Sequence, residues 1–152
     1  MKRRIMILDD DKQIRQSLLK FLQAEGYEVV LAADGQEGLD HFDPSNIDLL
    51  LLDLMLPRKS GWDVFERVTS LNPLLPIIIM TGKDKQRELA AAAGVGALME
   101  KPLDVPLLLK TITDLLAEPA ESRLKRLAGV ERSMRYFPLP SSRPPRFKVN
   151  RP

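Results

Sequence analysis

Three carboxylates, a hydroxyl and an ammonium group each follow an apolar stretch of the chain. These residues are Asp9, Asp10, Asp53, Thr81 and Lys101. Carboxylates gathered at one place repel one another and resist ionisation unless a cation lies among them. A hard divalent ion such as Mg²⁺ prefers oxygen ligands of this kind and keeps some of its water. The three aspartates are therefore candidate magnesium ligands.

Asp53 stands apart because it ends an almost wholly apolar stretch, residues 47–52, and precedes another, residues 54–56. A charge in such surroundings is costly unless it is paired or functional. Beside a metal ion, a carboxylate can act as a nucleophile towards phosphorus. Lys101 and Thr81 would then supply a positive charge and a hydroxyl donor for the phosphoryl oxygens. In the resting protein we expect Lys101 to pair with Asp53.

The apolar stretches alternate with helix-like segments, a pattern that predicts a parallel sheet with helices on both faces. The expected strands are residues 4–8, 27–32, 47–52, 76–80 and 97–100. The expected helices are residues 14–24, 34–42, 62–71, 84–93 and 105–117. In such open sheets the ligand crevice lies outside the carboxyl ends of the strands. The five polar side chains should therefore meet at one edge of the sheet.

Each of these residues also has a plain structural interpretation. An Asp pair before a helix is often only an N-cap, and Asp11 is itself a candidate cap for the helix ending at Ala24. Asp53 could open a polar turn, Thr81 could cap the following helix, and Lys101 could be a solvated loop charge. Their joint occurrence at the ends of four strands favours the chemical interpretation.

Residues 2–118 resemble the receiver domain of two-component response regulators. The resemblance rests on Ile7–Asp11, Leu51–Pro57 followed by Ser60-Gly61, Ile79–Gly82, and Met99–Pro102, in this order and spacing. It implies a doubly wound, flavodoxin-like α/β fold with five parallel strands in the order 2-1-3-4-5. It also implies a cis peptide bond before Pro102, which is plausible because only X-Pro bonds carry a small cis penalty.

The same resemblance implies a role for each site residue. Asp53 would accept the phosphoryl group, and Thr81 and Lys101 would contact it. Asp9, Asp10 and Asp53 would hold Mg²⁺ together with the main-chain carbonyl of Met55. The donor would be a sensor histidine kinase or a phosphotransfer protein, and the surface of residues 84–117 would switch and could form a homodimer. The chain would be a signalling protein, with no enzymatic activity beyond its own phosphorylation and dephosphorylation.

Three positions bear on how such a switch would work. Leu98 lies three residues before Lys101, where the family usually has an aromatic residue that moves inward on phosphorylation, and so departs from the family pattern. Gly82 follows Thr81 and loosens the backbone there. Met55 and Lys83 lie two residues after Asp53 and Thr81 respectively. The resemblance implies that these positions flank the attacking water, which two such large side chains would hinder. We therefore expect a long-lived phosphoryl state.

The charge of the chain changes at about residue 118. Residues 1–118 contain 14 basic and 19 acidic residues, a net of −5, whereas residues 119–152 contain 9 and 2, a net of +7. The second segment also holds six of the twelve prolines. Dense proline and like charge predict a mostly disordered extension, although Leu124, Leu127, Val130 and Met134 could line a short amphipathic helix. Such an arm could bind nucleic acid without sequence specificity, an acidic membrane surface or a partner, or could simply aid solubility.

Composition limits the remaining classes. The chain has 152 residues and no Cys, so disulfides and thiol chemistry are excluded. No stretch approaches the roughly 20 apolar residues of a membrane span, and a cytoplasmic location is expected.

Two hypotheses remain: a single-domain response regulator, and a receiver-derived interaction module in which the basic arm binds a partner. A metal-dependent phosphohydrolase is a distant third, because the chain lacks a cap domain and a separate acid–base residue.

Overall fold

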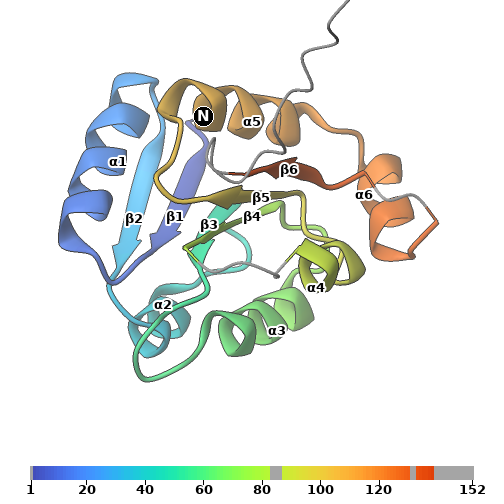
Figure 1. The fold of residues 1–152 in the computed structure, drawn as a ribbon, viewed down its shortest axis with the longest axis horizontal. Helices are drawn as coiled ribbons and strands as arrows, with labels where there is room; N and C mark the ends of the chain where they lie inside the picture. The colour runs from blue at the N-terminus through green and yellow to red at the C-terminus, as the bar shows by residue number, and fades with distance from the viewer. Residues whose placement is uncertain (1, 83–86, 131–132, 139–152) are drawn as a thin grey trace, which may run out of the picture.

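A computed structural model describes residues 2–82, 87–130 and 133–138 as a three-layer α/β sandwich around one sheet (Figure 1). All six strands are parallel, in the order β2-β1-β3-β4-β5-β6. The strands are β1 (Arg4–Leu8), β2 (Glu28–Ala32), β3 (Leu49–Asp53), β4 (Ile77–Thr81), β5 (Ala97–Glu100) and β6 (Arg135–Phe137). The flavodoxin-like fold and the order of the first five strands are confirmed.

Helices cover both faces of the sheet. They are α1 (Lys12–Ala24), α2 (Gly35–His41), α3 (Gly61–Leu71), α4 (Arg87–Ala92), α5 (Val105–Ala117) and α6 (Ala120–Leu127). Leu18 and Leu22 of α1 and Leu108 of α5 pack on one face, whereas Val64 of α3 and Ala90 of α4 pack on the other. Because both faces are covered, the central strands β3 and β4 are buried at every position.

Short polar side chains fix where the helices begin. The Asp11 carboxylate accepts hydrogen bonds from the main-chain N–H groups of Gln13 and Ile14, so Asp11 is the N-cap of α1, as expected. Ser60 and Asp63 form a capping box at the start of α3. These caps place α1 and α3 directly after the turns that follow Asp9 and Asp53.

The boundaries of β2, β3 and β4 differ from the predicted ones by one or two residues, whereas those of β1 and β5 agree. β3 starts at Leu49 and includes Asp53, and β4 includes Thr81, so these polar residues are the last strand residues rather than the first loop residues. Their main-chain groups therefore remain in the sheet, which restricts their side chains more than a loop would. The predicted helix 84–93 is observed as α4 from Arg87, and residues 83–86 lie outside the described part of the chain.

The sequence after residue 118 contributes a strand that was not predicted and a helix that was predicted only as a possible short amphipathic helix. α6 follows Pro119, and β6 pairs in parallel with β5 as a sixth strand (Figure 1). The sheet thus has one strand more than the five predicted, and α6 and β6 are the ordered elements described within an extension predicted to be mostly disordered. The amphipathic helix also stops earlier, at Leu127, with Gly129 at a φ of 72°. Among the helices in the described ranges, none combines the length and apolar character needed to cross a bilayer.

Candidate functional site

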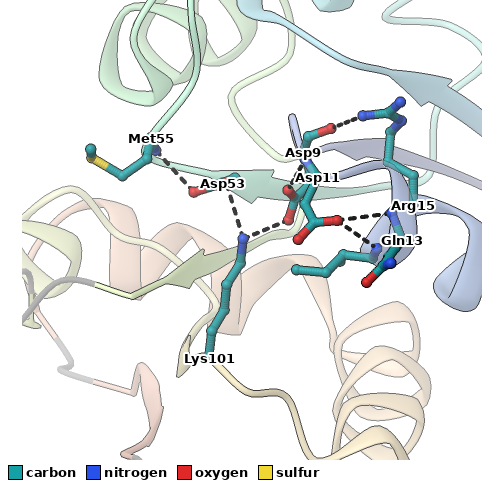
Figure 2. Close-up of polar contacts among 8 residues, drawn as sticks. Asp9, Asp11, Gln13, Arg15, Asp53, Met55 and Lys101 are labelled. Atoms are coloured by element: carbon teal, nitrogen blue, oxygen red, sulfur yellow. Dashed lines mark hydrogen bonds and ion pairs between the residues drawn. The ribbon is translucent and has the colours of Figure 1, made fainter.

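Four parallel strands bring the predicted site residues to one edge of the sheet. Asp9 follows β1, Asp53 and Thr81 end β3 and β4, and Lys101 follows β5. The strand register fixes the position of each residue along the strand direction, because Asp53 lies opposite Met80 and Thr81 lies opposite Glu100. Figure 2 shows the Lys101 side chain extending towards the carboxylates of Asp9 and Asp53.

Lys101 joins two buried carboxylates. Its Nζ donates to Oδ2 of Asp9 at 2.7 Å and to Oδ2 of Asp53 at 3.0 Å. The side chains of Asp9 and Asp53 are 0% and 3% exposed, and that of Lys101 is 20% exposed. The predicted pairing of Lys101 with Asp53 is therefore present, and Asp9 shares the same ammonium group.

Burial and ion pairing act in opposite directions on the pKa values of Asp53 and Lys101. Burial raises the pKa of Asp53 above its usual value, and the negative charge of Asp9 acts in the same direction. The N–H of Met55 and the ammonium of Lys101 oppose this rise without cancelling it. For Lys101, burial acts to lower the pKa, but hydrogen bonds and charge from Asp9 and Asp53 outweigh burial and hold the pKa above its usual value. The ion pair thus keeps charges in a place that disfavours them.

Main-chain and arginine donors hold the two carboxylates in position. The Met55 N–H donates to Oδ1 of Asp53 at 2.9 Å, and the Asp11 N–H donates to Oδ1 of Asp9 at 2.9 Å (Figure 2). Arg15, on the first turn of α1, donates to the Asp9 main-chain carbonyl at 2.8 Å. Sequence reasoning missed Arg15, because this contact depends on the direction in which α1 leaves β1.

Three carboxylates lie close enough to hold one metal ion. An oxygen of Asp9, one of Asp10 and one of Asp53 lie within 4.8 Å of one another, and of these residues only Asp10 is exposed. An all-oxygen set of this kind, with one side open to water, fits Mg²⁺ better than softer metals. The Met55 side chain is half exposed beside it. A groove of about 470 Å³, lined in part by Asp10, Met55 and Trp62, opens on the same side.

The remaining predicted positions lie around this centre. Thr81 is fully buried, and its carbonyl accepts from the Lys101 N–H at 2.8 Å. The Lys101–Pro102 peptide bond is cis, as expected. A Cβ atom at Gly82 would meet nothing within 4 Å, so there is space for alanine at this position. Leu98 is buried in β5, opposite Tyr136 of β6. Lys83 lies outside the described residues.

Comparison with known proteins gives one consistent family. The model of the response regulator receiver domain family matches residues 5–113. Response regulator MprA of Mycobacterium bovis is 38% identical over 134 residues, and MprA of Mycobacterium tuberculosis is 37% identical over 134 residues. Each match covers 84% of this chain and 58% of the relative, so the chain spans little more than half the length of these relatives.

Solved structures give the same result. A CheY-like response regulator receiver domain protein from Methanospirillum hungatei superposes with a TM-score of 0.71 at 32% identity, covering 82% of this chain and 98% of the other. A response regulator from Chloroflexus aurantiacus superposes with a TM-score of 0.71 at 30% identity, covering 78% of this chain and all of the other. The matched part therefore corresponds to a whole domain of those proteins.

Proposed function

The chain belongs to the response regulator receiver domain family, and from this premise we propose that it is a phosphoryl-accepting signalling protein with Asp53 as the acceptor. The observation that carries the proposal is the position of the Lys101 ammonium, which lies between Asp9 and Asp53 at hydrogen-bonding distance from both. One carboxylate would be enough to neutralise the Lys101 ammonium. The second carboxylate, together with exposed Asp10, makes the site suited to a cation and a phosphoryl group.

The proposed step is a transfer of a phosphoryl group to a carboxylate. An oxygen of Asp53 attacks phosphorus, an Asp53 O–P bond forms, and the bond from phosphorus to the donor nitrogen or oxygen breaks. The electron pair leaves with the donor atom: a leaving imidazole nitrogen takes up a proton from water, whereas a leaving carboxylate oxygen keeps the negative charge. Met55 holds Oδ1 of Asp53 through its N–H, so the nucleophile has a fixed direction before the donor arrives. Lys101 and Thr81 then balance charge and donate to the phosphoryl oxygens.

Asp9, Asp10, Asp53 and the Met55 carbonyl are the proposed ligands of Mg²⁺. When bound, the ion supplies positive charge that screens phosphoryl oxygens from the surrounding carboxylates. Asp10 is the exposed carboxylate of the three, so it is the one that an incoming ion meets first. Asp9 is fixed by the Asp11 N–H and by Lys101, which makes it a rigid anchor for the site.

The proposed donor is a sensor histidine kinase or a phosphotransfer protein, which places the chain in the cytoplasm. The proposed output is a change in the surface of residues 84–117, through which the chain could also form a homodimer. In this proposal the chain is a signalling protein whose own chemistry is limited to self-catalysed phosphotransfer and dephosphorylation.

A second candidate is a receiver-derived interaction module. One observation favours it: α6 and β6 are ordered elements, and β6 pairs with β5. The β5 residue at the position where the family usually has an aromatic residue is Leu98, which lies opposite Tyr136 of β6. In this alternative the basic segment after residue 118 binds a partner or nucleic acid, and Asp53 plays no signalling role.

The test is phosphorylation of the full chain by acetyl phosphate with and without Mg²⁺, measured by intact mass. We expect one Mg²⁺-dependent, acid-labile adduct of one phosphoryl group. Asp53→Asn should abolish the adduct, whereas the matched change Asp40→Asn, at an exposed position on α2, should leave it unchanged. An adduct that persists on Asp53→Asn would rule out Asp53 as the acceptor. No adduct on the unaltered chain would favour the interaction module.

A further inference from the structure

Helix α6 and strand β6, which we call the clasp, close the edge of the sheet that β5 would otherwise leave open. The Arg135 N–H donates to the Gly96 carbonyl at 3.1 Å, and β6 continues in register with Ala97, Leu98 and Met99. An open edge strand exposes main-chain groups that attract other strands. The clasp therefore occupies a surface to which a partner could otherwise bind.

Buried and paired arginines hold the clasp in place. Arg126 of α6 is 5% exposed; its guanidinium makes two hydrogen bonds to the Glu118 carboxylate, at 2.8 and 2.9 Å, and a third to the Gly94 carbonyl at 3.2 Å. Arg135 pairs with Asp114 of α5 at 3.3 Å. A buried guanidinium can satisfy this many hydrogen-bond acceptors only when the clasp lies in one position on the domain. The clasp therefore has a defined docking site.

Tyr136 connects the clasp to two elements at once. Its hydroxyl donates to Oε1 of Glu100, at the end of β5, at 3.1 Å. The guanidinium of Arg87, at the start of α4, lies 4.6 Å from the centre of its ring, within the range of a cation–π interaction. From its position on β6, Tyr136 thus contacts both the end of β5 and the start of α4.

Glu100 brings this contact to the edge of the candidate site. Glu100 directly precedes Lys101, and it lies opposite Thr81 in the β4–β5 register. The Lys101 N–H donates to the Thr81 carbonyl. A shift of Lys101 or Thr81 therefore moves Glu100, and with it the acceptor of the Tyr136 hydroxyl.

We propose that the clasp is a built-in ligand of the surface formed by α4, β5 and α5, and that phosphorylation of Asp53 loosens it through Glu100 and Tyr136. This inference rests on the proposed function. The docked clasp is fitted to the position that Glu100 takes while Lys101 bridges Asp9 and Asp53. Drawing Lys101 to a phosphoryl group changes that position, and an element that fits one state better than another shifts with it.

The experiment measures hydrogen exchange of the β6 amides by mass spectrometry in the full chain, before and after acetyl phosphate with Mg²⁺. Phosphoryl occupancy is read by intact mass from the same samples. We expect exchange in β6 to become roughly tenfold faster in the phosphorylated chain, which corresponds to the loss of one hydrogen bond to a charged acceptor. Asp53→Asn should show no such change.

Tyr136→Phe tests the contact itself, because it removes only the hydroxyl that reaches Glu100. We expect fast β6 exchange in this variant before phosphorylation, and little further change after it. Tyr27→Phe, the same chemical change at the other tyrosine, is the matched control and should behave like the unaltered chain. Equal exchange in the two variants would remove Tyr136 as the connection.

The outcomes separate the two proposals. A phosphoryl adduct accompanied by unchanged or slower β6 exchange would overturn the coupling and leave the proposed function standing. The absence of any adduct on the unaltered chain would overturn both, because the coupling presupposes phosphorylation.

Discussion

Replacement of Lys101 by methionine should destabilise the protein by about 3 kcal/mol in Mg²⁺-free buffer at neutral pH. Methionine keeps most of the side-chain bulk but leaves two carboxylates, 0% and 3% exposed, without their shared cation. Breaking a buried ion pair by removing one partner costs about 3–5 kcal/mol. We take the lower end because the Lys101 side chain keeps 20% exposure. For a chain of this length that loss lowers Tm by roughly 6–12 °C.

The deficit should depend on pH in one direction. The folded-state pKa of Asp53 is already raised by burial, so its charge costs stability at neutral pH, and that cost disappears as the pH falls through the raised pKa. Removing Lys101 removes an opposing interaction and raises the Asp53 pKa further. The pKa of Lys101 itself is raised, so its ammonium group stays charged throughout the acid and neutral range, and the change with pH comes from protonation of the carboxylates that it pairs with. The difference between Lys101→Met and the unaltered chain should therefore shrink as the pH is lowered from neutral towards 5.

Urea denaturation monitored by circular dichroism at several pH values measures this difference. Lys101→Arg keeps the positive charge and should retain most of the stability. Comparing it with Lys101→Met separates the effect of the charge from the effect of a changed side-chain shape. In an Asp53→Asn background Lys101→Met should cost less, because one of the two carboxylates is gone. A deficit below about 1 kcal/mol, compared with the 3–5 kcal/mol expected for a broken buried pair, would refute the reasoning, and so would a deficit that does not change with pH.

Three other changes test separate parts of the site. Asp53→Asn should raise stability without Mg²⁺ by about 1 kcal/mol, since burial no longer acts on a charge there; an unchanged or lower urea midpoint at neutral pH would contradict this. Asp10→Ala should weaken Mg²⁺ binding roughly tenfold by calorimetry while leaving stability within about 0.5 kcal/mol, because Asp10 is exposed; undiminished affinity would exclude it as a ligand. Gly61→Ala should destabilise by about 2 kcal/mol, because its Cβ would overlap Leu54 Cα and the Asp53 carbonyl oxygen. Gly82→Ala, with open space around its Cβ, is the matched control, and equal thermal unfolding of these two variants would refute the packing argument.

The convergence of Asp9, Asp53, Thr81 and Lys101 could be predicted from sequence because it depends on only two facts. Each residue follows an apolar stretch, and parallel strands all end at the same edge. The double pairing of Lys101 could not be predicted, because it depends on side-chain reach across the sheet. The hydrogen bond from Arg15 to the Asp9 carbonyl likewise depends on the angle at which α1 leaves β1.

Strand β6 escaped sequence prediction for a different reason. Three residues, Arg-Tyr-Phe, are too few to show the alternation that identifies a strand, and they lie in a segment rich in arginine and proline. What orders them lies elsewhere in the chain, at Gly96, Glu100 and Asp114. Charge that suggests disorder in isolation becomes stabilising when it meets acidic groups on a folded neighbour.

The parallel direction of all six strands has an electrostatic consequence for the site. Each helix that connects two parallel strands runs back against them, so its N-terminus lies at the edge where the strands end. α1 begins three residues after Asp9, and α5 begins four residues after Lys101. Each helix N-terminus carries about half a positive charge from its aligned peptide dipoles. The acidic cluster thus lies in a positive field created by the main chain itself, which reduces the cost of its negative charge without requiring another basic side chain.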